Sequence, residues 1–333
     1  MRLNKLLIPF ASALLAFAAC EEYDQQVNYP APAPKSEIGK TLVANTRYIY
    51  FYFIFKSRYI YSIYNDESYE LHPGVEVTEL AYLNNEGRSI RTFWYKIDLT
   101  NPEITLECIT PFNYPSVSGT NEVLSSMLSH VDKPGHKVLG GINTDFGGGA
   151  GPQGVYWRLG ECLSSKFKFL ADRPRCFVSI TKDKKVDMGT EAEYPEYLAA
   201  NQANISEVFC GSPRLIVDGK IDIAVPNDLD SESHPRTAIG IMPDKTTVYL
   251  MVVDGRRYTY SNGMYLSILA DMFHALGCEQ ALNLDGGGSS TFIVARDGEL
   301  GNPERMDVRN WPNDGGGVER PLHNGLAIIA NTK

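Results

Sequence analysis

Three glycine-rich stretches constrain the fold of this 333-residue chain more than any other sequence feature. They lie at residues 140–154, 283–291 and 313–317, and together they hold 13 of the 29 glycines. Glycine adopts positive φ angles without steric cost and lets the backbone approach a ligand closely. Clustered glycines therefore predict specialised loops. Successive N–H groups in such loops form a concavity that suits an anion.

Amide and acidic residues stand directly before each glycine run. The runs read Asn143-Thr144-Asp145-Phe146-Gly147-Gly148-Gly149, Asn283-Leu284-Asp285-Gly286-Gly287-Gly288-Ser289-Ser290-Thr291 and Asn313-Asp314-Gly315-Gly316-Gly317. The first two follow apolar segments, so each places an Asn and an Asp at the end of an expected strand. Simple turns with Asp as a cap would explain one such run. Its repetition indicates a phosphate-sized anion cradle flanked by carboxylates.

Arginines near expected strand ends are candidates for binding that anion. Arg214 and Arg236 each precede an apolar run, and Arg256 and Arg257 follow one. The net charge of −9 argues against a nucleic-acid binder, whose affinity depends on clustered Lys and Arg. In an acidic protein, a few local arginines can still hold an anionic ligand, and Arg236 is the first candidate.

The first third of the chain has the pattern of an antiparallel meander. Candidate strands rich in β-branched and aromatic residues occur at 41–64, 75–83, 90–99 and 104–110, with turn-forming clusters between them. The continuous apolar character of 41–64 predicts a strand that is covered on both faces.

The rest of the chain mixes helices and strands. Residues 121–131 fit a short amphipathic helix, and residues 264–276 fit a longer one. The longer helix lies between strand-like runs at 248–254 and 281–285, which predicts a βαβ-like unit.

The expected βαβ-like unit would bring two carboxylates together. If its two strands are parallel neighbours, Asp254 and Asp285 lie at the same carboxyl edge, where open α/β sheets place ligands. We therefore predict an α+β fold with β-rich mixed sheets, a few helices, an N-terminal antiparallel meander and a βαβ-like C-terminal unit.

Residues 1–20 have the pattern of a lipoprotein signal peptide. Arg2 and Lys5 precede an apolar run at 6–19, which is too short to span a bilayer, and Cys20 follows two alanines as in a lipobox. Acidic residues after Cys20 resemble the surface-export signal of Bacteroidetes lipoproteins. We expect an exported protein that is lipid-anchored at Cys20 to the outer membrane, at the cell surface if that signal acts. Simple secretion is the alternative.

The sequence suggests four parts. They are the signal peptide (1–20), a Pro-rich linker (21–39), a β-rich N-terminal part (40–137), and a part at 138–333 that packs with it as one catalytic unit. No other stretch predicts a transmembrane helix, so the lipid would be the only membrane attachment. We expect the other five cysteines to be core residues, with one or two disulfides left open.

Several segments together resemble the phosphodiester glycosidase family, which includes the lysosomal uncovering enzyme and bacterial lipoprotein relatives. The segments are GGINTDF, HPRTAIGI, VVDGRR, SNGMYLSILADMFHALGC and ALNLDGGGSST. The resemblance covers roughly residues 138–330. It implies hydrolysis of a sugar-1-phosphodiester of the GlcNAc-α type to free sugar and a phosphomonoester. It implies no cofactor, although a divalent cation stays open, and a phosphorylated glycan or sugar phosphodiester as the partner.

The resemblance also implies a set of site residues. The candidate catalytic residues are Asp285, Asp254 and Asp145, and the candidate substrate- and phosphate-binding residues are Asn143, Arg236, Thr237, Gly255, Asn283, Gly286, Gly287, Gly288, Ser289 and Ser290. A phosphate leaves as an anion because its second pKa is about 6, so an Arg and N–H donors can stabilise it. Our hypothesis is that Asp285 or Asp254 attacks C1 or activates water. Asp145 and Asn143 would then orient sugar hydroxyls or water.

Two other functions stay open at this point. A non-catalytic surface glycan-binding lipoprotein could stack sugars on Trp94, Trp157, Trp311 and some of the many tyrosines. A metal-dependent phosphodiesterase could cut the P–O bond, with the same Asp residues holding a cation. The sequence offers no close Cys or His pair with the spacing of a metal site.

Overall fold

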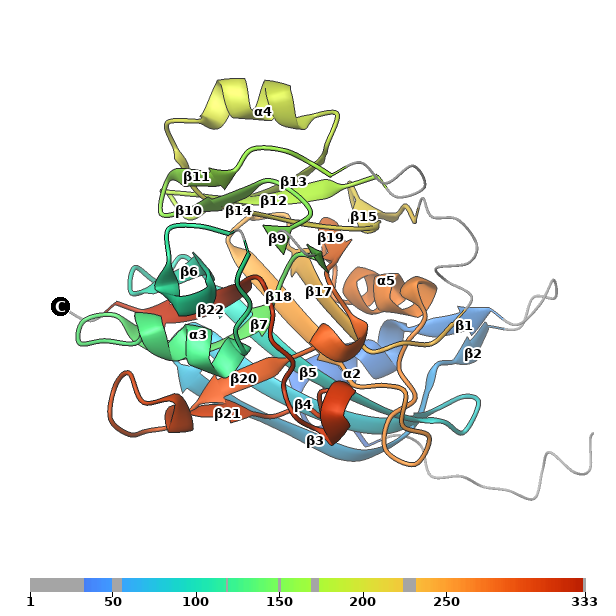
Figure 1. Ribbon diagram of the computed structural model, residues 1–333. Helices are drawn as coiled ribbons and strands as arrows, with labels where there is room; N and C mark the ends of the chain where they lie inside the picture. Colours follow the sequence, from blue (N-terminus) through green and yellow to red (C-terminus); the bar gives the residue numbers. More distant parts are fainter. Residues whose placement is uncertain are drawn as a thin grey trace, which may run out of the picture.

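The computed structural model describes residues 33–49, 56–117, 119–148, 151–168, 174–223 and 232–331 (Figure 1). The expected signal peptide and the lipidation residue Cys20 lie outside the described residues. The first described helix begins at Glu37, inside the range expected for the linker, and Ser36 caps it by accepting a hydrogen bond from the Gly39 N–H at 2.8 Å. Within these ranges, no helix combines the length and apolarity that crossing a membrane requires.

The strands form three large sheets and two small ones. The eight-stranded sheet has the order β16 (Lys220–Ile221), β15 (Arg214–Val217), β19 (Gln280–Asn283), β17 (Arg236–Ile241), β18 (Thr247–Val253), β5 (Ser89–Asp98), β4 (Val75–Asn84), β3 (Ile60–His72). One five-stranded sheet has the order β21 (Met306–Val308), β20 (Phe292–Ala295), β7 (Lys137–Asn143), β22 (Gly325–Ala330), β6 (Ile104–Ile109). The other has the order β11 (Glu161–Ser164), β10 (Tyr156–Arg158), β14 (Ile205–Gly211), β12 (Cys176–Thr181), β13 (Val186–Thr190). The small sheets pair β1 (Arg47–Ile49) with β2 (Lys56–Arg58), and β8 (Gly147–Gly148) with β9 (Gly151–Pro152).

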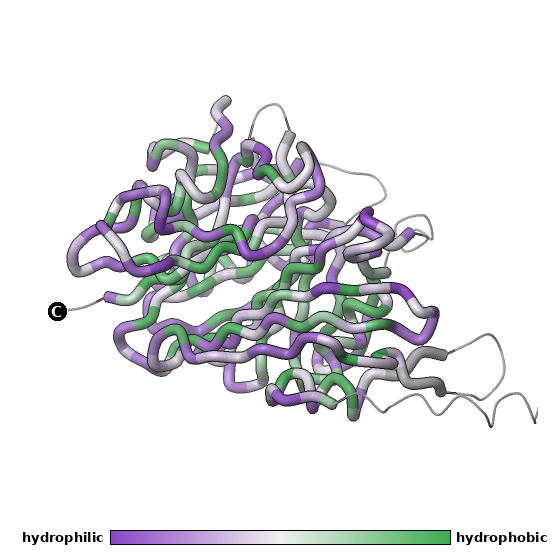
Figure 2. Tube along the Cα trace, turned by 90° about the horizontal axis from the view of Figure 1, so that it is seen from below, coloured by the Kyte–Doolittle hydropathy of each residue, from purple (hydrophilic) through white to green (hydrophobic). Residues whose placement is uncertain are grey.

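Apolar side chains of all three large sheets meet in one central core, which includes Tyr95, Ile142 and Phe209. Helices cover the outer faces: α2 (Glu37–Asn45) and α5 (Leu266–Ala275) pack on the eight-stranded sheet, α3 (Leu124–Val131) on the sheet of β7, and α4 (Tyr194–Asn201) on the sheet of β14 (Figure 1). Figure 2 shows hydrophobic residues along the inner strands and hydrophilic ones in the peripheral loops. The predicted α+β fold is therefore confirmed.

The N-terminal meander is present as β3, β4 and β5, which pair antiparallel in chain order. Two expected strand segments differ from the prediction. Residues 41–45 belong to α2, because the Ser36 cap starts a helix whose Leu42 is fully buried against the eight-stranded sheet. The segment at 104–109 is β6, which leaves the meander and pairs with β22 in another sheet.

The expected βαβ-like unit contains an additional strand. Both β18 and β19 pair antiparallel with β17, so they run parallel to each other but are separated by β17. The condition that they are neighbours is not met, because β17 fills the position between them. Their carboxyl ends still lie at the same edge of the sheet, and the loops that follow carry Asp254 and Asp285.

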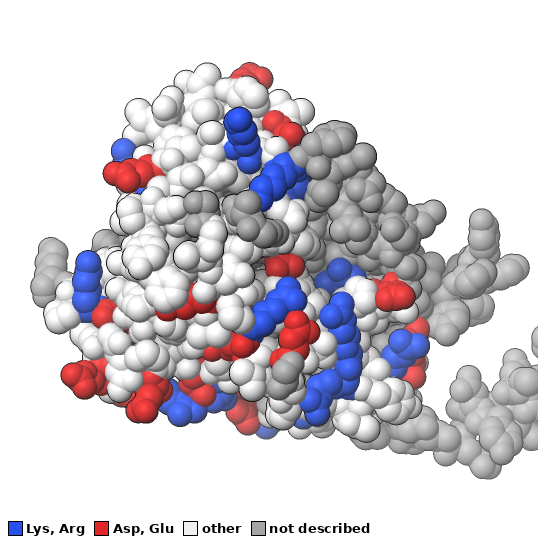
Figure 3. All heavy atoms as spheres, viewed as in Figure 1, with Lys and Arg blue, Asp and Glu red and all other residues white. Residues whose placement is uncertain are grey.

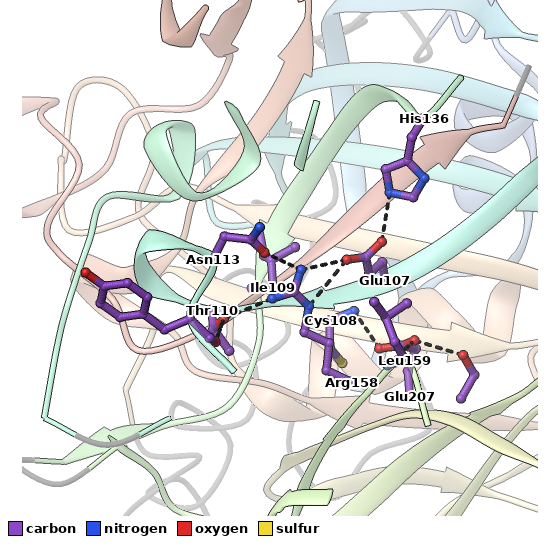
Figure 4. A network of polar contacts seen from close by, with 12 residues as sticks. Glu107, Cys108, Ile109, Thr110, Asn113, His136, Arg158, Leu159 and Glu207 are labelled. Carbon is purple, nitrogen blue, oxygen red and sulfur yellow. Dashed lines mark hydrogen bonds and ion pairs between the residues drawn. The ribbon is translucent and has the colours of Figure 1, made fainter. Parts of the chain in front are cut away.

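A buried polar cluster joins two sheets where β6 faces β14 (Figure 4). The Glu207 carboxylate accepts hydrogen bonds from the N–H groups of Cys108 and Leu159, both at 3.0 Å. Next to it, Glu107 accepts a hydrogen bond from Arg158 at 2.9 Å and contacts His136 at 2.9 Å. Glu207 thereby supplies one acceptor to Cys108 on β6, the last strand of its sheet among the described residues, and another to Leu159, which directly follows β10.

The five described cysteines are all free, so the structure does not support the open alternative of disulfides. Cys108, Cys176, Cys210 and Cys278 are buried and act as small core side chains, whereas Cys162 is exposed.

Candidate active site

Two cavities meet at Asp285, beyond the carboxyl ends of β18 and β19. The first, which we call the carboxylate cavity, has a volume of about 290 Å³ and is lined by Asn121, Asn143, Asp145, Gly147, Asp285, Ser289, Arg320, Pro321, Leu322, His323 and Asn324. The second, which we call the arginine cavity, has a volume of about 370 Å³ and is lined by Phe146, Gln153, Arg175, Ser212, Pro213, His234, Pro235, Arg236, Arg256, Leu266, Asn283, Asp285, Gly286 and Gly287. Figure 3 shows basic and acidic side chains intermingled in the middle of one face of the molecule.

Asp285 is the residue that the two cavities share. Its side chain is 16% exposed, and its carboxylate accepts a hydrogen bond from Ser289 Oγ at 2.5 Å. The Arg320 guanidinium lies 3.7 Å from the same carboxylate oxygen. Burial raises the pKa of Asp285 to about 6, and the charge of Asp145 adds to this rise, while Ser289 and Arg320 oppose it. Asp285 is therefore ionised at neutral pH but close to its protonation point.

Asp145 lies in the wall between the two cavities and is paired. Its Oδ1 forms an ion pair with Arg175, and its Oδ2 accepts the Gly154 N–H at 2.8 Å. Burial raises the pKa of Asp145, and the Arg175 charge opposes that rise. Both carboxylate oxygens have partners, so Asp145 is suited to fixing the charge and geometry of the site.

The Asn143 side chain forms hydrogen bonds with three other segments of the chain. Its Nδ2 donates to the backbone carbonyl of Asp285 at 2.6 Å, while its Oδ1 accepts from Thr237 Oγ1 at 2.8 Å and from the Thr291 N–H at 3.1 Å. Thr237 is fully buried and is connected to the site by its hydrogen bond to Asn143. Asn283 donates to the Ser212 carbonyl at 2.7 Å and lines the arginine cavity.

Arg175, Arg236 and Arg256 supply the positive charge of the arginine cavity, which His234 also lines. Arg236 is buried, and its guanidinium is held by the carbonyl of Met264 at 3.0 Å. Arg256 is exposed, and its Nε lies 3.4 Å from His234 Nδ1. Burial and the charges of Arg236 and Arg256 lower the pKa of His234, so the imidazole is neutral at neutral pH. Asp285 is the acidic residue of this lining, and the cavity therefore suits an anion.

The second glycine run contributes less to anion binding than expected. Residues Gly287–Ser289 form a 3₁₀ turn whose hydrogen bonds use the N–H groups of Ser289 and Ser290, and the Gly287 N–H donates to the Pro235 carbonyl at 3.0 Å. The expected row of N–H donors is therefore largely occupied by the turn itself. Close packing favours glycine in this run, because a Cβ at Gly286 would lie 2.7 Å from the backbone oxygen of Pro235, and a Cβ at Gly288 would displace the Asp314 carboxylate, which would lie 2.0 Å away.

Asp314 belongs to the third glycine stretch, which thus reaches the site. It accepts a hydrogen bond from Arg320 at 2.9 Å, and Arg320 also bonds to Ser289 Oγ. The first stretch contributes Gly147, which packs against the ring of His323. All three glycine stretches therefore meet around Asp285.

Asp254 and Gly255 lie beside the site and line neither cavity. Asp254 is buried, and its carboxylate accepts hydrogen bonds from the Asn310 side chain at 2.9 Å and from the Trp311 N–H at 2.9 Å. Burial raises its pKa. A Cβ at Gly255 would lie 2.7 Å from the backbone nitrogen of Pro235. Both residues are placed to hold loops together.

Ser290 and two of the three tryptophans are also buried away from the cavities. Ser290 lines neither cavity. Trp94 and Trp157 belong to the hydrophobic core, so they cannot stack on a glycan as the binding alternative required. Trp311 is 38% exposed, but the guanidinium of Arg257 lies over its ring at 4.3 Å.

Several lining residues were absent from the predicted set, and four of them carry charged or polar side chains next to the central carboxylates. They are Arg175, Arg320, His323 and Asn324. Arg175 directly precedes β12, as Arg214 and Arg236 precede their strands, but no glycine run lies beside it. The other three follow the third glycine stretch at 313–317, and that proximity was the only local signal for them. Among the described residues, no group of three or more His, Cys, Asp or Glu side chains is arranged to hold a metal ion.

The chain is similar to known proteins in sequence and in fold. The family model of the phosphodiester glycosidases matches residues 136–329. The catalytic domain of zebrafish N-acetylglucosamine-1-phosphodiester alpha-N-acetylglucosaminidase, auto-inhibited by its pro-peptide, superimposes with a TM-score of 0.59 at 16% identity, covering 80% of this chain and 88% of that one. A hypothetical protein from Synechocystis superimposes with a TM-score of 0.52 at 13% identity, covering 80% of this chain and 64% of that one. The sequence matches none of the curated proteins with which it was compared. At these identities the two structures support the fold.

Proposed function

Because this chain belongs to the phosphodiester glycosidase family, we propose that it hydrolyses the glycosidic bond of a sugar-1-phosphodiester of the GlcNAc-α type. The products would be the free sugar and a phosphomonoester. The observation that carries the proposal is the position of Asp285, a carboxylate with a raised pKa at the junction of a cationic cavity and a second polar cavity.

The arginine cavity is suited to the phosphodiester group. Guanidinium groups bind phosphate oxygens with charge-assisted hydrogen bonds, and Arg236 is already fixed by its bond to the Met264 carbonyl. Such fixed cations stabilise the negative charge that grows on the leaving phosphate as the C1–O bond breaks. The bond's electron pair passes to the phosphate oxygen, so the leaving group needs little protonation.

Asp285 is the carboxylate that can act at C1. In its ionised form it either attacks C1 to form a glycosyl ester, which water then cleaves, or removes a proton from the attacking water. In both routes water supplies the hydroxyl group of the released sugar and a proton. Asp145, paired with Arg175, and Asn143, bonded to the Asp285 backbone, would hold this arrangement in place.

Product identification tests the proposed reaction. The purified protein is incubated with methyl GlcNAc-α-1-phosphate diester, and the products are separated by mass. Free GlcNAc and methyl phosphate support the proposal, GlcNAc 1-phosphate indicates P–O cleavage, and binding without turnover indicates a glycan-binding protein. Asp285→Asn and Asp254→Asn are assayed in parallel, and full activity in both variants contradicts a carboxylate mechanism at these positions.

We also propose that the protein is exported and lipid-anchored to the outer membrane, from the sequence pattern around Cys20. Metabolic labelling with a fatty acid should label the wild-type chain and leave Cys20→Ala unlabelled. Equal labelling of both would contradict the anchor.

A further inference from the structure

The carboxylate cavity has the size and lining of a site for one sugar ring. With the phosphodiester among the arginines, the bond to be broken lies at Asp285 and the sugar extends into the cavity on its other side. The volume of about 290 Å³ is near the lower end of small-molecule pockets, roughly 300–1,000 Å³. Its lining includes the neutral polar side chains of Asn121, Ser289 and Asn324, which suit sugar hydroxyls.

Asn324 is a buried member of this lining whose amide orientation is fixed. Its side-chain oxygen accepts hydrogen bonds from the Asp145 N–H at 2.8 Å and from Thr144 Oγ1 at 2.5 Å. A backbone N–H can only donate, so the atom that faces it must be the amide oxygen. The other amide atom, Nδ2, is therefore the nitrogen, and it can only donate.

Asn324 Nδ2 has no hydrogen-bond partner among the described residues, although the residue is only 1% exposed. The nearby Asp145 carboxylate already pairs with Arg175 and accepts a hydrogen bond from the Gly154 N–H. A buried donor without an acceptor carries a desolvation cost, which a bound ligand oxygen removes. Asn324 lines the carboxylate cavity together with Asp145 and Asp285, so its unpaired donor belongs to a residue at the wall of the space that a ligand would occupy.

We propose that Asn324 is a specificity-determining residue, and that its Nδ2 donates a hydrogen bond to one oxygen acceptor of the sugar ring in the carboxylate cavity. The acceptor is a ring hydroxyl or the acetamido carbonyl, which share this chemistry. The inference rests on the proposed function, because it requires a sugar phosphodiester to be bound at Asp285.

The test asks whether the effect of removing the Asn324 side chain depends on one oxygen of the substrate. Wild type and Asn324→Ala are assayed on methyl GlcNAc-α-1-phosphate diester and on analogues that each lack one hydroxyl or the acetamido carbonyl. We expect the variant to lose at least about 10-fold in kcat/KM on the parent compound. On the analogue without the recognised oxygen, wild type and variant should differ by less than about 2-fold. Removing the oxygen from the substrate and removing the side chain from the protein eliminate the same hydrogen bond.

Two further variants make the result decisive. Asn324→Asp keeps the oxygen that Asp145 and Thr144 require but removes the donor, so it should show the same substrate dependence if Asn324→Ala folds poorly. Asn204→Ala changes an exposed asparagine that lines neither cavity and should behave as wild type. An equal loss on every analogue would overturn the role of Asn324. Failure of wild type to release sugar from any compound would instead overturn the proposed function.

Discussion

Asn143 donates a hydrogen bond from its side-chain nitrogen to the backbone carbonyl of Asp285 at 2.6 Å, although the two residues are 142 positions apart. The bond joins β7 of one sheet to the loop after β19 of another. The position of the central carboxylate is therefore set by an interaction between sheets and not only by its own loop.

Asn143→Ala should impair both stability and catalysis. The substitution leaves the Thr291 N–H and the Asp285 carbonyl unpaired in a buried region, which costs about 3 kcal/mol of unfolding free energy. It also releases Asp285 from its position, so kcat should fall more than KM changes. Urea unfolding and steady-state kinetics measure both effects. Asn45→Ala removes an exposed asparagine and is the matched control.

The pH dependence of the reaction should report the titration of Asp285. Its pKa is raised to about 6, and the ionised form is the active one, so kcat/KM should increase as pH rises through about 6 and then level off. Asp285→Asn should abolish turnover.

Asp271 provides the control for this profile, because burial also raises its pKa to about 6 but it lies on α5 and lines neither cavity. Asp271→Asn should keep the acidic limb of the profile. Loss of the limb in Asp271→Asn, or its survival in an active Asp285→Asn enzyme, would contradict the assignment.

Arg256→Ala should weaken binding of the phosphodiester. The guanidinium lines the arginine cavity and is exposed, so its removal should not affect folding. Loss of one charge-assisted bond corresponds to a decrease of about 10- to 100-fold in kcat/KM, mainly through KM. Arg257→Ala removes the adjacent arginine, which stacks on Trp311 outside the cavity, and should leave KM unchanged. Equal effects of the two substitutions would indicate a general electrostatic contribution.

Glu207 should make the protein less stable as pH rises. Burial raises its pKa from 4.5 to about 8, so the folded state favours the protonated carboxyl. Below about pH 4.5 both states are protonated and no penalty exists. Between that pH and about 8 the unfolded state ionises first, and the folded state loses on the order of a few kcal/mol.

The difference in unfolding free energy between wild type and Glu207→Gln isolates this effect. The difference should change across pH 4.5–8, whatever the absolute stability of the variant. Glu196→Gln alters an exposed residue of α4 and should give a difference that is independent of pH. A constant difference for Glu207→Gln would show that its carboxyl stays ionised in the fold.

The sequence allowed prediction of the features that depend on neighbouring residues. The meander follows from alternating strand patterns with turns between them, and Asp285 was located because a glycine run follows a strand. The same local evidence misplaced residues 41–45, where burial of Leu42 and the Ser36 cap outweigh strand propensity.

Features that depend on contacts between residues far apart in the sequence could not be predicted from the sequence. The insertion of β17 between β18 and β19 leaves no local pattern. Arg175 reaches Asp145 across 30 residues, and Asn324 reaches it across 179. The glycine run also gave no indication that its own 3₁₀ turn would occupy the N–H groups expected to bind the anion.

The pairing of β5 with β18 shows that the folded unit begins before the region that matches the family model. Seven consecutive residues of each strand are in register, from Thr92 opposite Val253 to Asp98 opposite Thr247. The family match begins at residue 136, so a fragment cut at that border would lose β3, β4 and β5 and expose the backbone of β18 as an open edge. Such edges recruit strands from other molecules. The border of sequence similarity is therefore a poor choice for truncation, because the segment before it supplies the strand that covers β18.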